Sequence, residues 1–174
     1  MIMVIGNVLD RHELAALREA ARDLPFEDGK ATAGRYARDV KSNLQARPSD
    51  ELEAVLDTVR GKLMANELFT SVARPRNFAR LLLSRYGPGM EYGLHVDDPI
   101  MKGQRTDLSF TLPLSDAGEY DGGGLVIDDP IEERVIRLNA GDVVVYPTSA
   151  LHRVEPVTRG ERMAVVGWVT SWVA

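Results

Sequence analysis

Cysteine is absent from this chain of 174 residues. That absence excludes disulfide bonds, thiolate-ligated zinc sites and cysteine nucleophiles. A secretory signal is also missing, because residues 1–6 lack a basic segment and a long apolar core, and charged residues begin at Asp10. No apolar run is long enough to span a membrane. We therefore expect a cytoplasmic protein without a membrane partner.

An excess of basic residues is lacking as well. The net charge is −5, whereas a nucleic-acid-binding surface needs clustered lysine and arginine to neutralise phosphates. The content of 44% hydrophobic and 27% charged residues is ordinary for a globular protein. The length suits one core that is stable alone, so we predict a single domain over residues 1–174.

Two amphipathic helices are predicted in the first half of the chain. Asp10 and Glu13 have the spacing of a capping box, and apolar residues then recur at helical intervals until Pro25. A second helix begins at Ser49. Its apolar stripe, which we expect to pack against a sheet, consists of Leu52, Val55, Leu56, Val59 and Leu63. Residues 26–47 are irregular, and they fit either paired strands with loops or a mobile lid.

From residue 78 onward, short apolar runs alternate with turn-forming clusters. Eight strands are predicted, at residues 79–86, 92–97, 107–114, 125–128, 133–138, 142–146, 151–156 and 162–171. No helix-length pattern interrupts them, which argues against a parallel α/β sheet. We predict an α+β, mainly β fold of the jelly-roll type, with a core over about 78–172 and two supporting helices within about 10–70.

His95 and Asp97 lie two positions apart in the predicted strand 92–97. Side chains at positions i and i+2 of a strand project from the same face, so an imidazole and a carboxylate can meet at one point. The adjacent Asp98 is expected to point away from that face.

His152 offers a third ligand, 57 positions after His95. Strands that are distant in sequence become neighbours in a jelly roll, so this gap is compatible with convergence. Two histidines and a carboxylate form the facial triad typical of non-haem Fe(II), which leaves three coordination positions for a 2-oxo acid and O2. His12, in the first turn of the first helix, is instead expected to be a surface residue.

Arg162 follows His152 by ten positions. A dicarboxylate co-substrate bound to the metal needs its far carboxylate neutralised, and a guanidinium is the best bidentate donor for that purpose. In a regular strand Arg162 and Trp168 share a face, and neighbouring strands can add the hydroxyl groups of Tyr86, Ser109 and Thr111. Each pattern alone has a simpler explanation as chance, core packing or a solvated charge, and only their conjunction in one β region supports the hypothesis.

Short segments between residues 40 and 162 carry a family pattern, namely 40–43, 85–86, 92–97, 105–109, 120–123, 140–142, 146–147, 151–152 and 156–162. On these segments the chain resembles the Fe(II)- and 2-oxoglutarate-dependent dioxygenases of the prolyl 4-hydroxylase-like group and, within it, the bacterial PKHD-type hydroxylases. The likeness covers about residues 40–171. Two departures are Gly124, where the family usually has glutamate, and the family's C-terminal helical segment, which has no counterpart before Ala174.

The resemblance implies a double-stranded β-helix that hydroxylates an unactivated C–H bond and releases succinate and CO2. It implies Fe(II), 2-oxoglutarate and O2, with ascorbate as a candidate reductant. By matching position, His95, Asp97 and His152 are the metal ligands, and Arg162 with Tyr86 holds 2-oxoglutarate. We add Ser109 to the cofactor-binding residues.

The substrate stays open between a small molecule, an amino acid and a peptide, as does the choice between hydroxylation and desaturation or epoxidation. Residues 26–47 and 98–106 are the predicted specificity loops. The candidate substrate contacts are Tyr92, Asn43, Trp168 and Arg105. Five basic residues would favour an acidic substrate if they line the mouth of the site, and otherwise form a solvated rim: Arg35, Arg38, Lys41, Lys102 and Arg105. The rival function is that of a cupin-like metal-binding β sandwich, an isomerase or a sensor, which would not need Arg162 to face the metal.

Overall fold

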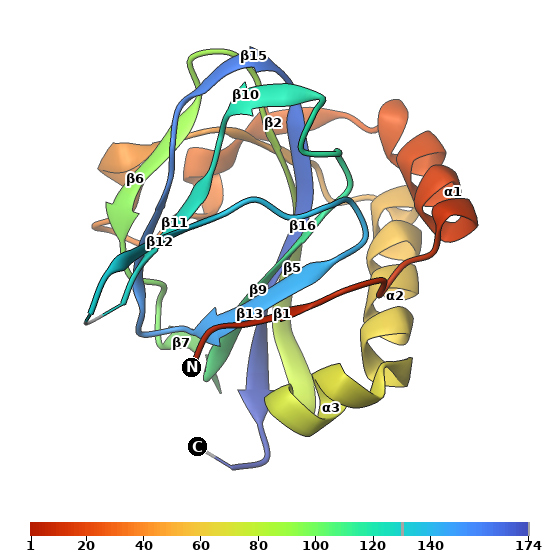
Figure 1. Cartoon of the computed structure of the whole chain (residues 1–174), viewed down its shortest axis with the longest axis vertical. Coiled ribbons are helices and arrows are strands. Elements are labelled where there is room, and N and C mark those ends of the chain that lie inside the picture. The colour runs from red at the N-terminus through yellow and green to blue at the C-terminus, as the bar shows by residue number, and fades with distance from the viewer. Residues whose placement is uncertain (130, 174) are drawn as a thin grey trace.

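Two antiparallel sheets form the computed structural model, which describes residues 1–129 and 131–173 (Figure 1). The large sheet has the order β1 (Met3–Ile5), β13 (Val143–Pro147), β9 (Leu108–Pro113), β16 (Arg162–Ser171), β5 (Pro75–Tyr86), β4 (Leu44–Ala46) and β2 (Phe26–Asp28). The small sheet has the order β12 (Glu133–Ile136), β11 (Leu125–Asp128), β14 (Leu151–Val154), β6 (Glu91–His95) and β3 (Lys41–Ser42). Two short pairs join β7 (Ile100–Met101) to β8 (Gln104–Arg105) and β10 (Tyr120–Gly122) to β15 (Val157–Gly160). All eight strands expected from the sequence are present, two of them (125–128 and 162–171) with the predicted ends and the other six with shifted ends.

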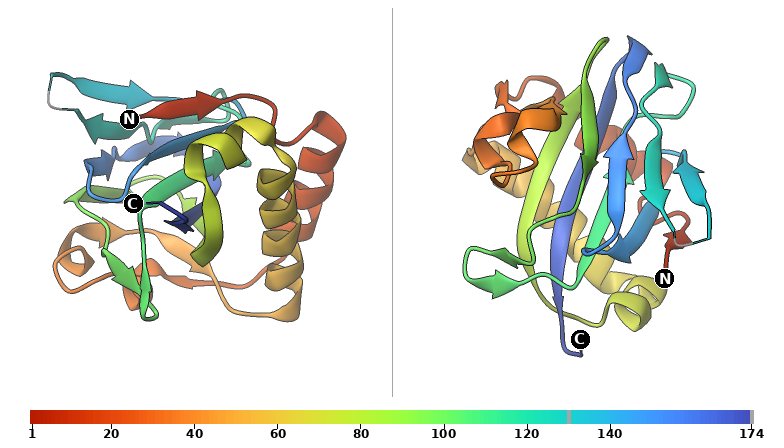
Figure 2. Two further views of the ribbon diagram at one scale, coloured as in Figure 1. Left: turned by 90° about the horizontal axis from the view of Figure 1, so that it is seen from below. Right: turned by 90° about the vertical axis from the view of Figure 1, so that its left-hand side faces the viewer.

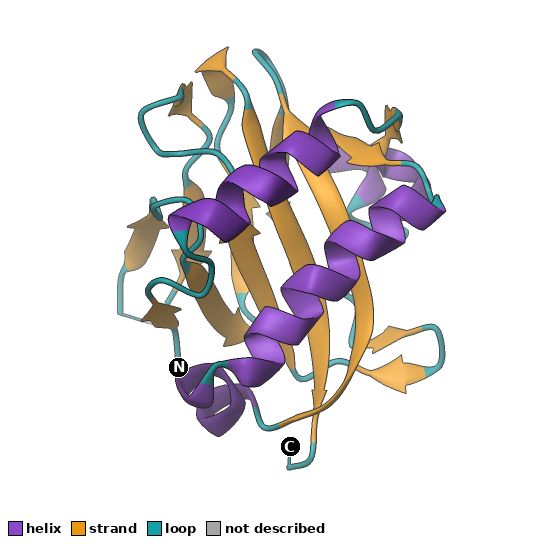
Figure 3. Cartoon of the chain, turned by 90° about the vertical axis from the view of Figure 1, so that its right-hand side faces the viewer, coloured by secondary structure: helices purple, strands orange, loops and turns teal. Residues whose placement is uncertain are grey.

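Helices cover one face of the large sheet (Figure 3). They are α1 (Arg11–Arg22), α2 (Asp50–Ala65) and α3 (Glu67–Ala73), and α1 lies beside α2 (Figure 2, left). The apolar stripe predicted for the second helix is buried from Leu52 to Leu63, as expected. Among the described residues, none of these helices has the length and apolar character needed to cross a membrane.

The short helix α3 was not predicted. Its seven residues span only two turns, which is too little for a periodic pattern to stand out. Asn66 caps it by accepting a hydrogen bond from the backbone N–H of Phe69, and the Phe69 side chain is fully buried. Tertiary packing therefore stabilises a helix that the local sequence pattern does not predict.

Strand β5 shows how the large sheet separates a core from a cavity. Leu81 and Leu83 face the helices and join the main apolar cluster, which includes Phe69 and Phe110. The alternate positions, Arg80, Leu82, Ser84 and Tyr86, line a cavity on the opposite face. Because successive side chains of a strand point to opposite faces, one strand serves both the core and the site.

Residues 26–47 form paired strands, one of the two arrangements expected for them. Between β2 and β4 the chain makes two 3₁₀ turns, Gly29–Thr32 and Arg38–Val40. Strand β3 pairs Lys41 with Tyr92 at the edge of the small sheet, whereas β4 pairs Leu44 with Arg85 of the large sheet. This segment therefore bridges the two sheets along one side of the cavity.

The start of α1 provides a stability prediction. Asp10 accepts a hydrogen bond from the backbone of Glu13 at 2.8 Å, and Glu13 accepts one from the backbone of Asp10 at 3.0 Å, which is the predicted capping box. We expect Asp10→Ala to lower the free energy of unfolding by about 1 kcal/mol, because the backbone N–H of Glu13 in the first helical turn loses its acceptor. Urea unfolding measures the change, with the exposed Glu19→Ala as control. Equal midpoints for the two variants would contradict the role of the cap.

Candidate active site

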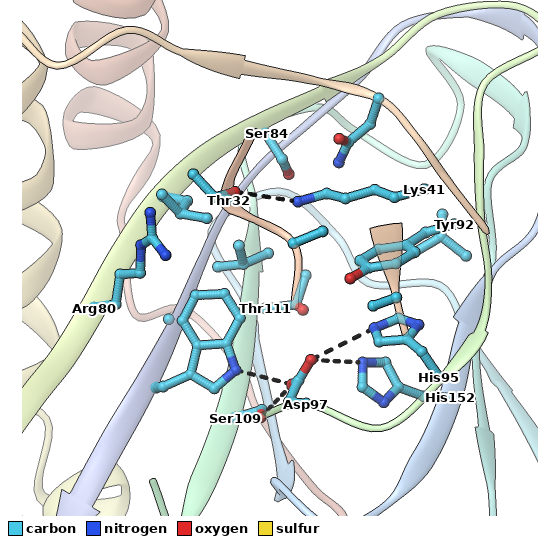
Figure 4. A pocket seen from close by; sticks show the side chains of 18 of the residues that line it. Thr32, Lys41, Arg80, Ser84, Tyr92, His95, Asp97, Ser109, Thr111 and His152 are labelled. Carbon is cyan, nitrogen blue, oxygen red and sulfur yellow. Dashed lines mark hydrogen bonds and ion pairs between the residues drawn. The ribbon is translucent and has the colours of Figure 1, made fainter. Parts of the chain in front are cut away.

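A cavity opens between the two sheets, on the face of the large sheet that the helices leave free. It encloses about 860 Å³ including its mouth, a size suited to a small ligand. Strands of both sheets and the bridging segment 26–47 contribute to its walls, and Figure 4 shows many of these side chains.

His95 and His152 lie opposite each other on the neighbouring strands β6 and β14. In each ring Nδ1 contacts a backbone carbonyl oxygen, at 2.7 Å for Gly93 and at 2.9 Å for Ala150. A carbonyl can only accept a hydrogen bond, so Nδ1 carries the proton and Nε2 keeps its lone pair. The Tyr92 ring stacks on His95 at 3.6 Å between centroids and holds its orientation.

Asp97 comes to the same point from the segment that follows β6. Its Oδ2 accepts hydrogen bonds from Ser109 Oγ at 2.7 Å and from Trp168 Nε1 at 2.9 Å, both on the large sheet. Its Oδ1 lies 3.5 Å from His95 Nε2 and 3.7 Å from His152 Nε2 (Figure 4). One oxygen is thus used for orientation while the other faces the two imidazoles.

These three ligand atoms fit a metal ion. All of them lie within 4.8 Å of one another. Ligands about 2.1 Å from an ion and at right angles to each other are separated by roughly 3 Å, which is close to the spacing found here. His95 Nε2 is buried and has no hydrogen-bond partner among the described residues, a costly arrangement unless an ion accepts its lone pair. The proton on each Nδ1 is also the usual state of metal-binding histidines.

The protonation states of these groups suit a cation. Burial raises the pKa of Asp97, but His95, the charge of His152 and the hydrogen bond from Ser109 outweigh it and bring the pKa to about 2. Burial lowers the pKa of His152. The carboxylate is therefore ionised and the His152 imidazole neutral near pH 7, as a divalent metal requires.

Arg162 and Tyr86 lie side by side deeper in the cavity, paired between β16 and β5. The Arg162 side chain is buried, yet within residues 1–129 and 131–173 nothing accepts a hydrogen bond from its guanidinium. Its carbon Cζ lies 5.2 Å from the centre of the Tyr86 ring. Burial raises the pKa of Tyr86, although the Arg162 charge opposes this, so the phenol keeps its proton and remains a donor. An unpaired buried cation beside a hydroxyl donor suits a carboxylate ligand.

The structure gathers most of the residues that sequence reasoning singled out. The cavity is lined by Tyr86, Tyr92, His95, Asp97, Ser109, Thr111, His152, Arg162, Trp168 and Asn43. Ser109 and Trp168, which were expected at the cofactor and the substrate, also donate hydrogen bonds to the carboxylate of Asp97. His12 is exposed on α1, as predicted.

Two expectations fail on geometry. Asp98 was expected to point away, but it lines the cavity because β6 ends at His95 and the strand alternation stops there. Arg105 was grouped with the substrate contacts, but it is not among the lining residues. Its guanidinium is held by Asp107 at 2.7 Å and by the carbonyl oxygen of Ser171 at 2.9 Å. Among the five basic residues considered for the mouth, only Lys41 lines the cavity.

Arg80 is a lining residue that sequence reasoning missed. It belongs to the predicted strand 79–86, which also contains Tyr86. Counting back from Tyr86 by two residues at a time leads to Ser84, Leu82 and Arg80, so the alternation already contained the signal.

A family model described as the 2OG-Fe(II) oxygenase superfamily matches residues 81–170, which include every group of the triad. The chain belongs to this superfamily. The oxygenase is also 51% identical over 173 residues to a PKHD-type hydroxylase of Maricaulis maris, covering 99% of this chain and 79% of that protein. It is 53% identical over 148 residues to a PKHD-type hydroxylase of Parvibaculum lavamentivorans, covering 85% and 68% of the two chains. It is therefore a 2-oxoglutarate-dependent hydroxylase with Fe(II) as its cofactor.

Solved structures show the fold of the oxygenase. A 2OG-Fe(II) oxygenase family protein from Burkholderia pseudomallei matches with a TM-score of 0.70 and 22% identity, over 96% of this chain and 84% of that one. The viral collagen prolyl hydroxylase of Paramecium Bursaria Chlorella virus-1, solved as a 2OG complex, matches with a TM-score of 0.67 and 20% identity, over 98% and 96%. The predicted double-stranded β-helix is thereby confirmed.

Proposed function

We propose that this oxygenase hydroxylates an unactivated C–H bond of a small molecule, amino acid or peptide, with release of succinate and CO2, and that residues 1–174 act as one domain. The observation that carries the proposal is the convergence of two proton-free imidazole nitrogens and one carboxylate oxygen at a single point. Three protein ligands leave room for co-substrates on the same ion.

In this proposal His95, Asp97 and His152 hold Fe(II), which supplies the redox chemistry with O2 and 2-oxoglutarate. The protein fixes the geometry of these ligands. The two backbone carbonyls that accept from Nδ1 keep both Nε2 atoms aimed at the ion. Ser109 and Trp168 keep Asp97 from rotating, because both donate to the oxygen that faces away from the histidines.

Arg162 and Tyr86 bind the far carboxylate of 2-oxoglutarate in this proposal. The guanidinium neutralises the charge, and the phenol donates a further hydrogen bond. An apolar cluster that includes Tyr120, Leu125 and Val157 closes the cavity around them and limits the access of water. Low access of water strengthens the ion pair with the co-substrate. Nothing in the site favours the cupin-like alternative, since Arg162 faces the cavity.

The test is spectroscopic. Anaerobic protein mixed with Fe(II) and 2-oxoglutarate is expected to show a weak metal-to-ligand charge-transfer band in the visible region, because the 2-oxo acid chelates the ion. Fe(II) with succinate, which has no keto group, is the control and should give no band. Admitting air together with ascorbate should then convert 2-oxoglutarate to succinate and CO2, with one oxygen atom of O2 entering succinate and ascorbate reducing the other to water. A protein that binds Fe(II) but shows neither the band nor succinate would refute the proposal.

A further inference from the structure

Two cationic side chains line the cavity without belonging to the metal site or to the proposed co-substrate site. Lys41 enters from β3 on the bridging segment, and Arg80 enters from β5 of the large sheet. Figure 4 shows their side chains reaching into the space above His95, Asp97 and His152 from opposite walls. They therefore frame the volume in which a substrate must lie to reach the triad.

Lys41 is a buried cation whose partners in the described part of the chain are neutral, namely the Thr32 hydroxyl and the Tyr92 ring, whose centre lies 5.2 Å from Nζ. Its side chain is 6% exposed, and Nζ contacts Thr32 Oγ1 at 3.4 Å. Thr32 in turn donates to Gln45 Oε1 at 2.5 Å, so its oxygen is oriented to accept from the ammonium. Burial, and then the charge of Arg80, lower the pKa of Lys41 to about 8. A buried lysine is rare unless it is paired, and no carboxylate pairs with this one in the described part of the chain.

Arg80 likewise has no anionic partner among the described residues. It is partly buried opposite Trp168, its cross-strand neighbour on β16. Across residues 1–129 and 131–173, no group accepts a hydrogen bond from its guanidinium. Its five N–H donors are therefore available to a ligand in the cavity. Arginine presents these donors in a planar fork that fits an oxyanion.

The charges that remain after cofactor loading favour an anion. The charges of Fe(II) and the 2-oxoglutarate dianion cancel, as do those of Arg162 and Asp97. Lys41 and Arg80 then face only the carboxylate of Asp98 among the charged groups that line the cavity. The loaded cavity thus keeps a net positive charge, which is carried by Lys41 and Arg80.

We propose that the substrate carries an oxyanion group, a carboxylate or a phosphate monoester, that binds between Lys41 and Arg80 and presents a C–H bond to the metal. This inference rests on the proposed function, because it names the substrate class of the same site. It excludes neutral and cationic molecules as preferred substrates. A ligand anion would also provide the opposite charge that both Lys41 and Arg80 lack.

The experiment measures binding without turnover. Protein loaded with Zn(II) and saturating 2-oxoglutarate is mixed with C4–C8 alkyl and aryl carboxylic acids, their carboxamides, and the matching phosphate monoesters. Dissociation constants come from saturation-transfer NMR. We expect acids or phosphates to bind at least tenfold more tightly than the amides, and the better anion identifies the group. Lys41→Met and Arg80→Met should each weaken binding of the better anion at least tenfold, whereas substitution of the exposed Lys30 by Met should leave it unchanged.

Three outcomes would overturn the inference. If neither the carboxylates nor the phosphate monoesters bind more tightly than the amides, the cavity does not select an anion. A preference for the better anion that survives in both Lys41→Met and Arg80→Met would place the anion site elsewhere. A tenfold loss of 2-oxoglutarate affinity in these variants would assign the two cations to the co-substrate. The Fe(II) charge-transfer band of the wild-type protein is recorded in parallel, so a failure of the proposed function is recognised separately.

Discussion

His152→Ala is expected to lower 2-oxoglutarate-dependent succinate formation by more than about a hundredfold. Residues that only orient metal ligands already contribute roughly 10- to 100-fold, and His152 offers the metal its own lone pair. The imidazole lies in the cavity wall and outside the two apolar clusters, so the fold should persist. Succinate release measures the activity, and circular dichroism measures the fold.

His12→Ala is the matched control for this variant, because His12 is the one histidine of the sequence besides His95 and His152 and is exposed on α1. It should retain wild-type activity and iron content. Full succinate formation by a folded His152→Ala protein would remove His152 from the metal site. Collapse of its circular dichroism spectrum would show instead that the ring is a core residue.

Arg162→Met is expected to weaken 2-oxoglutarate binding by at least about 30-fold. Truncating one partner of a buried ion pair costs about 2–5 kcal/mol, and the methionine retains most of the aliphatic volume while losing all five donors. Titration of the charge-transfer band with 2-oxoglutarate at constant Fe(II) measures the dissociation constant. Iron affinity without 2-oxoglutarate should change little, because in the described part of the chain no hydrogen bond or ion pair joins the guanidinium to the triad.

The control for Arg162→Met is Arg159→Met, three residues earlier. Arg159 is exposed and pairs with Asp121 at 2.7 Å. The Arg159→Met substitution therefore removes the same charge without changing the cavity. Its 2-oxoglutarate affinity should equal that of the wild type. An unchanged affinity in Arg162→Met would mean that another cation of the cavity holds the dicarboxylate.

Much of the fold is predictable from the sequence, because it depends on patterns that repeat. Turn-forming clusters divide the second half of the chain into strands, and the stripe from Leu52 to Leu63 predicts the packing face of α2. The short elements are different. Helix α3 and strands β2, β3 and β4 have two to seven residues each, and tertiary contacts decide their conformation.

The site divides in the same way. The identities of His95, Asp97, His152 and Arg162 follow from spacing and from the family pattern. The partners that orient them do not, because the carbonyls of Gly93 and Ala150 are backbone groups that no side-chain motif reveals. Lys41 and Arg80 lie 39 positions apart in the sequence and on different sheets, so only the folded chain shows that they share a cavity.

The three ligands are anchored to different layers of the molecule. The histidines belong to β6 and β14 of the small sheet, whereas Asp97 is fastened to Ser109 and Trp168 of the large sheet. An ion that binds all three ligands connects the small sheet to the large sheet. Metal binding and the packing of the two sheets are consequently linked equilibria, so bound iron stabilises the closed arrangement of the sheets.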